Sequence, residues 1–254
     1  MSATLRIIGS SPAVPRPNGA SSCYVLRSEG VTLVLELGSG ALGKLIAKHD
    51  LAQVDAVLIS HMHADHFFDL VPLRYALKYA VRRRSPLSVY LPPEGSKKLH
   101  AVVSPFAPRG SFFDGIVDVA EYSPDRTLRV RDVRITFAKT RHYIDGYAMR
   151  VRMGAQTFVF SSDTAPQPAL VEFARGADLF LCECALGEAG EEHGRRGHCN
   201  ANEAAAMAAQ AAVKHLVLTH YPASQTASRL KHAAAGAFSG RITVADDGME
   251  IALE

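Results

Sequence analysis

The sequence has little that would mark a membrane, secreted or nucleic-acid-coating protein. No apolar run reaches the roughly 18 residues of a membrane-spanning helix, and the opening MSATLRIIGSSPAVP lacks the basic start and apolar core of a secretion signal. The formal net charge is only +3, and the densest basic run, Arg82, Arg83 and Arg84, is interpreted as a solvated helix end. We therefore expect a cytoplasmic protein with no membrane partner, for which nucleic acid is not a favoured partner.

Cysteine is scarce as well. The four cysteines are Cys23, Cys182, Cys184 and Cys199, and none forms a CxxC pair. This spacing excludes the usual cysteine zinc motifs and the disulfide framework of a small secreted domain, and it favours reduced thiols. Cys182 and Cys184 stand two apart on an apolar strand and are expected to face the core.

Runs of apolar and β-branched residues alternate with helical patterns along the chain. Strands are predicted at residues 4–9, 21–27, 31–37, 54–60, 133–139, 147–153, 156–162, 178–184, 214–220, 241–245 and 248–254. Helices are predicted at residues 40–50, 67–83, 166–176, 200–213 and 223–238. Residues 92–115 are rich in Pro, Gly and Ser and are expected to be irregular. The simplest architecture is one α/β domain, residues 1–254, with helices covering two sheets.

The stretch SHMHADHFFDL, residues 60–70, concentrates polar side chains directly after a predicted buried strand. His61 and His63 are two apart, so on an extended chain both imidazoles project to the same side. Asp65 and His66 follow where the chain must turn into a helix. Burying so many polar groups without a metal would be costly, so the cluster predicts a metal site.

Three further ligand-type side chains follow other predicted strands: His142, Asp163 and His220. Taken alone, each histidine is more typical of a surface or core-edge position, and Asp163 is a candidate helix cap. Ligand-type residues at the ends of several strands in an α/β protein are, however, what a shared crevice needs. We therefore expect these three to meet the cluster at residues 61–66.

The motif SHMHADH, followed in order by His142, Asp163 and His220, resembles the metallo-β-lactamase superfamily, whose HxHxDH signature carries two metal ions. The segments GSSPAVPRPNGASSCYVL, HYIDGYAMRV, SSDT and GHCNANEAAAMAAQAAVKHLVLTHYP are similar to the branch of ribonuclease Z and the small cyclic phosphodiesterases. The resemblance covers nearly the whole chain and implies a four-layer αββα sandwich.

By this resemblance the chain is a metal-dependent hydrolase that holds two divalent ions. The implied ligands are His61, His63 and His142 for one ion, Asp65, His66 and His220 for the other, and Asp163 between them. Imidazole and carboxylate ligands suit zinc, with manganese as the alternative. The implied reaction is attack on a phosphodiester by a hydroxide that bridges the two ions.

The resemblance also implies a proton donor for the leaving group. His198, in RRGHCNANEAA, matches the family's histidine in that role, and Glu183 matches the acidic residue that orients it. Judged from the residues alone, His198 is a candidate helix flank and Glu183 a candidate salt-bridge partner. With Asp65, they form the predicted catalytic set.

The spacing between His142 and Asp163 bears on the substrate. In bacterial ribonuclease Z a long arm that grips transfer RNA lies between the matching positions, whereas here they are 21 residues apart. Without the arm and with little excess positive charge, a small phosphodiester, such as a cyclic one, is the favoured substrate. The alternatives are transfer-RNA 3′ processing, hydrolysis of a carboxylic ester, lactone or thioester on the same fold, and a non-catalytic metal-binding protein. A homodimer is expected as the commonest assembly.

Overall fold

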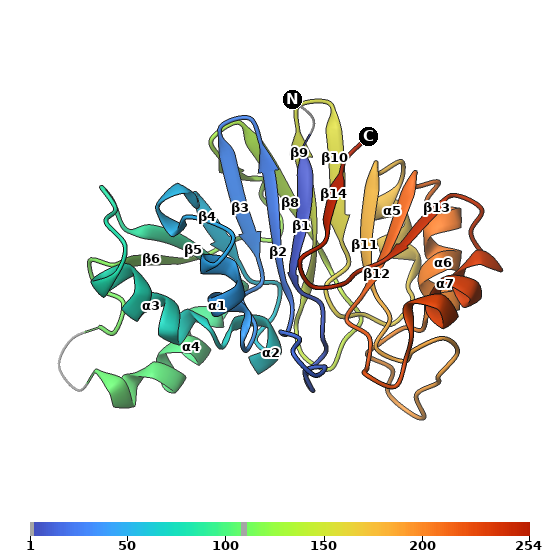
Figure 1. Ribbon diagram of the computed structural model, residues 1–254, viewed down its shortest axis with the longest axis horizontal. Coiled ribbons are helices and arrows are strands. Elements are labelled where there is room, and N and C mark those ends of the chain that lie inside the picture. Colours follow the sequence, from blue (N-terminus) through green and yellow to red (C-terminus); the bar gives the residue numbers. More distant parts are fainter. Residues whose placement is uncertain (1–2, 108–110) are drawn as a thin grey trace.

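Two seven-stranded sheets face one another in residues 3–107 and 111–254, the part of the chain that the computed structural model describes (Figure 1). The first sheet runs in the order β14 (Glu250–Ala252), β1 (Thr4–Gly9), β2 (Cys23–Ser28), β3 (Val31–Leu35), β4 (Ala56–Leu58), β5 (Leu87–Leu91) and β6 (Val117–Glu121). The second runs in the order β13 (Arg241–Val244), β12 (His215–Thr219), β11 (Leu179–Glu183), β10 (Gln156–Phe160), β9 (Tyr147–Met153), β8 (Val133–Lys139) and β7 (Leu128–Val130).

Helices cover the outer face of each sheet, as Figure 1 shows. Beside the first sheet lie α1 (Ala41–Ile46), α2 (Ala64–Phe67), α3 (Leu70–Tyr79) and α4 (Gly95–Val103), with short 3₁₀ turns at Leu51–Gln53 and Ser104–Phe106. Beside the second lie α5 (Pro168–Ala174), α6 (Ala201–Gln210) and α7 (Ala227–Ala235). The predicted four-layer αββα sandwich is confirmed.

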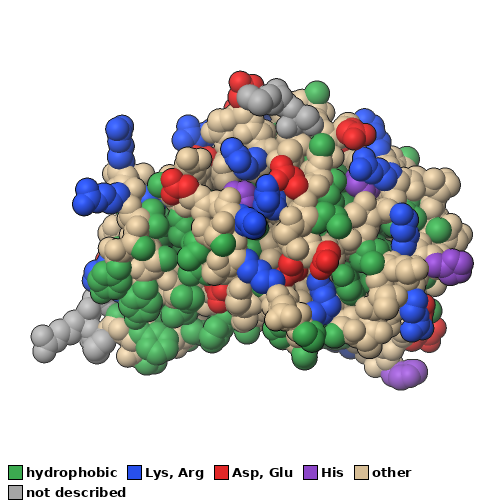
Figure 2. Space-filling model, viewed as in Figure 1, with side chains coloured by type: hydrophobic (Ala, Val, Ile, Leu, Met, Phe, Trp, Pro, Cys, Tyr) green, Lys and Arg blue, Asp and Glu red, His purple; other side chains and the backbone are tan. Residues whose placement is uncertain are grey.

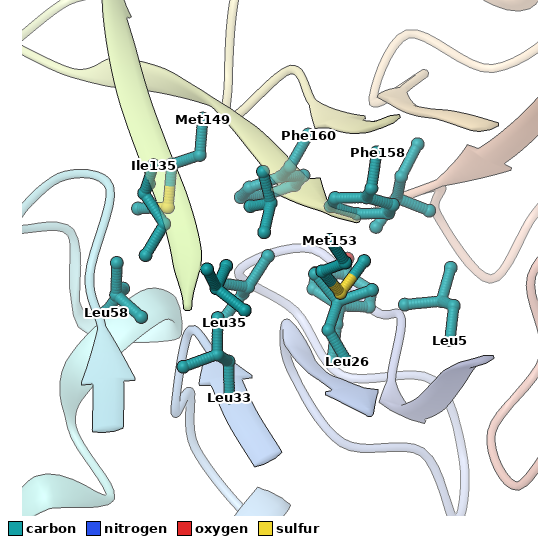
Figure 3. Close-up of a cluster of buried hydrophobic side chains, with 14 of the residues drawn as sticks. Leu5, Leu26, Leu33, Leu35, Leu58, Ile135, Met149, Met153, Phe158 and Phe160 are labelled. Carbon is teal, nitrogen blue, oxygen red and sulfur yellow. The ribbon is translucent and has the colours of Figure 1, made fainter. Parts of the chain in front are cut away.

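Side-chain alternation along the strands produces the layers. Leu33, Leu35 and Leu58 point from the first sheet toward Phe158 and Phe160 of the second, where they fill the central core (Figure 3). The residues between them on the same strands point outward, to the helices. Burying each large apolar side chain contributes about 1.5–3 kcal/mol, so this alternation holds both sheet faces in place.

The strand directions bring several strand ends to one edge of the sandwich. Strands β3 to β6 are parallel to one another, and so are β10 to β13. Within each sheet, the carboxyl ends of these strands therefore lie at one edge, where the following loops begin. In an open α/β arrangement such an edge is where ligands bind.

Some element predictions were wrong. Residues 92–115, of which 108–110 lie outside the described residues, were expected to be irregular but include α4, whose Leu99 and Val103 pack into the core. The helix predicted at residues 67–83 is divided between α2 and α3 and ends earlier, at Tyr79. Strands β5, β6 and β7 were not predicted; β6 buries only Val117, so it lacks an apolar alternation. No helix in the described residues is long and apolar enough to cross a membrane.

Candidate metal centre and active site

The candidate metal-binding side chains all follow strands that end at the same edge. His61 comes after β4, His142 after β8, Asp163 after β10 and His220 after β12. His63 is the N-cap residue of α2, and Asp65 and His66 lie in its single turn. The HxHxDH stretch is thus half extended chain and half helix, so its side chains approach one point from two directions.

The first group consists of His61, His63, His142 and Asp163, whose ligand atoms all lie within 4.8 Å of one another. The Nδ1 atom of His63 is 3.1 Å from Nε2 of His61 and 3.1 Å from Nε2 of His142. Oδ2 of Asp163 is 3.7 Å from Nε2 of His61. Three imidazole nitrogens and a carboxylate oxygen therefore face a common point.

The second group consists of Asp65, His66, Asp163 and His220, within the same limit of 4.8 Å. Oδ2 of Asp163 is 3.4 Å from Nε2 of His66 and 3.3 Å from Nε2 of His220. Oδ2 of Asp65 is 3.4 Å from Nε2 of His66. Because Asp163 belongs to both groups, its carboxylate lies between them, at the position predicted for a bridging ligand.

The outer ring nitrogens are held by neighbours, which turns the inner nitrogens toward the centre. His142 Nδ1 donates to the Gly197 carbonyl at 2.8 Å. His220 Nδ1 lies 3.0 Å from Oγ of Ser22, and His61 Nδ1 lies 3.0 Å from Oγ of Ser60. In metal sites such partners fix the tautomer and aim the ligand.

Burial and the local charges set the protonation of the group. Burial lowers the pKa of His61 and lowers that of His142 to about 4, so both rings are neutral near pH 7 and present a lone pair. Burial opposes ionisation of Asp65, but neighbouring His66 outweighs it and lowers the pKa of that carboxyl to about 2. Neutral imidazoles and ionised carboxylates are the forms that bind metal.

The donor set fits divalent ions. Both ring nitrogens of His66 are fully buried and make no hydrogen bond within the described residues. Burial disfavours a charge on His66, yet the carboxylates of Asp163 and Asp65 raise its pKa. The two carboxylates therefore stabilise a positive charge at this position. A metal ion would supply that charge and give Nε2 a partner. Nitrogen and oxygen donors together suit zinc or manganese.

Glu36 also belongs to the site, although it was not predicted from the sequence. It follows β3, is fully buried, and places Oε2 3.5 Å from Nδ1 of His66 while Oε1 accepts from the Ser60 amide at 3.0 Å. Its backbone is left-handed, with φ 60°, as are Ser162 (φ 55°) and the candidate ligand His220 (φ 56°). Such conformations are strained for residues with a side chain and concentrate at functional sites. An acidic residue ending an apolar strand was the available signal.

His198 and Glu183 form a pair beside the candidate metal ligands. His198 Nδ1 donates to Oε1 of Glu183 at 2.8 Å, and the His198 ring centre is 4.9 Å from that of His142. Backbone amides of Thr164 and Ala185 donate to the two Glu183 oxygens, at 2.9 and 2.8 Å. Burial disfavours the charged form of His198, but the Glu183 carboxylate outweighs it and raises the pKa of His198 to about 9. The pair can therefore hold a proton next to the centre.

The loop between β11 and α6 covers one side of the site. Oε2 of Glu192 accepts from the backbone amides of Gly197 and His198, at 2.7 and 3.0 Å, and the Tyr143 hydroxyl donates to Oε1. The Tyr143 ring lies so close to Gly197 that a Cβ there would come within 2.6 Å of it. Glu192 thus fixes the peptide that carries both the carbonyl bound to His142 and the His198 side chain. Its local sequence gave no signal for this contact.

Comparisons with known proteins agree with this geometry. A model of the β-lactamase superfamily domain matches residues 39–221. The probable metallo-hydrolase YhfI of Bacillus subtilis is 30% identical over 245 residues, which cover 95% of this chain and 96% of that protein. The YhfI crystal structure, described as a metallo-β-lactamase fold protein, matches with a TM-score of 0.89 at 28% identity over 99% of this chain and 100% of that one.

A more distant relative extends the likeness to a named activity. A ribonuclease Z of Ignicoccus hospitalis is 27% identical, and the match covers 85% of this chain and 87% of that protein. The family model alone spans more than half of the chain. The chain therefore belongs to the β-lactamase superfamily and is a hydrolase of the metallo-β-lactamase fold related to ribonuclease Z.

Proposed function

We propose that this hydrolase cleaves a small phosphodiester, cyclic ones included, with two divalent metal ions. The observation that carries the proposal is the pairing of His198 with Glu183 at 2.8 Å, beside the two groups of candidate ligands. An acyl ester with a good leaving group needs no such donor, whereas an alkoxide leaving from phosphorus at neutral pH does.

The chemistry assigns each residue one task. Hydrolysis forms a bond from a water oxygen to phosphorus and breaks the bond from phosphorus to the leaving oxygen, which then requires a proton. His198 gives that proton from Nε2, and the Glu183 carboxylate stabilises the imidazolium beforehand and fixes the ring through Nδ1. The attacking water loses a proton to solvent, and His198 takes up a proton from solvent, so the imidazolium is regenerated for the next reaction.

The metal ions are assigned to the two groups of side chains that share Asp163. Zinc is the preferred ion and manganese the alternative. When bound, divalent ions neutralise the charge on phosphate oxygens and lower the pKa of water. The outer partners Ser60, Ser22 and Glu36 keep the imidazoles aimed at that position.

The size of the substrate follows from the segment between His142 and Asp163. This segment contains the β9–β10 hairpin, Tyr147–Met153 and Gln156–Phe160, and nothing larger. Grip on a transfer RNA normally needs many phosphate contacts, and neither this hairpin nor the net charge of +3 offers them. A small phosphodiester is therefore preferred over a transfer-RNA precursor, although several relatives bear the name ribonuclease Z.

The experiment compares two substrates on one protein. Initial rates of metal-stripped protein are measured with and without added Zn²⁺ or Mn²⁺, on bis(p-nitrophenyl) phosphate and on p-nitrophenyl acetate, with Asp65→Ala as the blank. Metal-dependent cleavage of the phosphodiester, absent from the blank, is the expected result. Cleavage of the acetate alone would replace the proposal with a carboxylic ester or lactone hydrolase. Equal rates in the blank would remove the metal mechanism itself.

A further inference from the structure

A second concave surface, named here the arginine pocket, lies on the opposite edge of the first sheet. It has a volume of about 680 Å³ and is formed by the β2–β3 turn, the 3₁₀ turn before β4, the connection from α3 to β5, and the β7–β8 turn. Five arginines line it: Arg27, Arg82, Arg83, Arg84 and Arg131. In Figure 2, Lys and Arg side chains project from the upper left of the molecule, where the α3–β5 connection lies.

The residues that line the pocket carry a net positive charge. Asp55 is the only acidic residue among the lining residues, and its Oδ1 is already paired with Arg131 at 2.6 Å while Oδ2 accepts from the Thr32 amide. Arg83 donates to the carbonyls of Leu51 and Ser85. These bonds pre-position two of the five guanidinium groups.

The other three arginines have no such partner. Arg27, Arg82 and Arg84 make no ion pair or side-chain hydrogen bond within residues 3–107 and 111–254, and all three are exposed. The run at residues 82–84 does not end a helix as predicted, since α3 ends at Tyr79. Like charges gathered in a concave surface repel one another unless an anion is bound there.

The pocket is separate from the candidate metal centre. Residues at the amino ends of β3, β4 and β5 line it, whereas His61 follows the carboxyl end of β4. His61 is six positions after Asp55, which at about 3.3 Å per residue of strand is roughly 20 Å. A ligand in the pocket is therefore not a substrate held at the metal centre.

The lining points to phosphate as the ligand chemistry. Guanidinium groups bind phosphate oxygens in pairs of parallel hydrogen bonds, and hydroxyls of Ser28, Thr32, Ser85 and Ser88 add further donors. The volume lies in the range of small-molecule sites, about 300–1,000 Å³. We propose that the arginine pocket binds a small metabolite with two or more phosphate groups, independently of the active site.

The test measures binding of fructose 1,6-bisphosphate to the metal-loaded protein by isothermal titration calorimetry at about 150 mM salt, where weak surface pairing is screened. One site per chain is expected. The double variant Arg82→Ala/Arg84→Ala removes two exposed guanidinium groups. It should raise the dissociation constant about tenfold or more. The matched control Lys97→Ala/Lys98→Ala removes the same charge from exposed positions of α4 outside the pocket.

Five outcomes overturn the proposal. Four are no binding to the wild type, equal weakening in the control, equal affinity for fructose 6-phosphate, and unchanged affinity in the arginine variant. Asp65→Ala locates the anion: retained binding supports the arginine pocket, and lost binding places the anion at the metal centre instead. If the double variant fails to fold by circular dichroism, Arg27→Ala, near the end of β2, replaces it, with the same expectation.

Discussion

His198 differs from His61, His142 and His220 in its partner, because its Nδ1 donates to a buried carboxylate, whereas theirs face a hydroxyl or a carbonyl. Replacing His198 with Ala should therefore leave the bound metal in place and lower turnover of a phosphodiester with a poor leaving group by roughly 10²–10⁴-fold. Metal content by elemental analysis and turnover by product release are the two measurements. His193→Ala, an exposed histidine of the same loop, is the matched control. Loss of metal, or no change in rate, would remove His198 from the proton-donor role.

Glu36 would affect a bound metal ion only through His66, whose Nδ1 it faces. Gln at position 36 keeps the acceptor for the Ser60 amide but removes the negative charge 3.5 Å from Nδ1 of His66. We expect Glu36→Gln to weaken binding of Zn²⁺ about 10- to 100-fold, since such outer carboxylates orient the imidazole and increase its basicity. Competition with a chromophoric chelator measures the affinity, and Glu250→Gln on the surface is the control. An unchanged dissociation constant would contradict this role for Glu36.

At the scale of strands and loops, site residues that are close in the sequence are easier to predict than residues that meet only through strand pairing. Residues 61–66 converge through the geometry of one strand end and one helical turn, so their pattern alone indicated a metal site. Glu36 reaches the same place only because β3 pairs in parallel with β4, with Leu35 opposite Leu58. That register is a long-range property: the end of an apolar strand marks Glu36 as a candidate but does not place it beside His66. Glu192 and Tyr143 carry no local signal.

The loop between β11 and α6 offers a prediction at this scale. Glu192→Ala removes the acceptor that fixes the Gly197–His198 peptide, so the proton donor loses its position while the capping box of Asn200 and Glu203 still starts α6. We expect kcat to fall roughly 10- to 100-fold with little change in KM or melting temperature, because misplacement of a catalytic group acts on the chemical step. Steady-state kinetics of Glu192→Ala test this prediction, and Glu191→Ala, a change at the exposed neighbouring residue, is the control. A rise in KM alone would instead indicate direct contact with substrate.

The stability of the whole molecule should depend on pH through His215, far from the candidate metal ligands at the amino end of β12. Burial lowers the pKa of His215 to about 4, and its Nε2 lies 2.9 Å from Oγ1 of Thr243. Between about pH 6.5 and 4, His215 therefore binds a proton in the unfolded chain but not in the folded protein. The free energy of unfolding is thus highest above pH 6.5 and decreases as the pH falls through this window. His215→Asn should flatten the fall by about 1–2 kcal/mol, as measured by urea unfolding at several pH values. Parallel profiles for both proteins would rule His215 out.

The candidate metal centre also joins the two halves of the sandwich. His61 and His66 follow strands of the first sheet, whereas His142, Asp163 and His220 follow strands of the second. Ions bound here would therefore cross-link the sheets at one edge and exist only in the folded state. A ligand at about 1,000 times its dissociation constant stabilises a protein by about 4 kcal/mol, so chelation should lower the melting temperature by roughly 8–16 °C. Scanning calorimetry with and without chelator measures this shift. It should vanish in Asp163→Ala, because that carboxylate serves both groups, and a shift that persisted there would mean that the stabilising ions bind elsewhere.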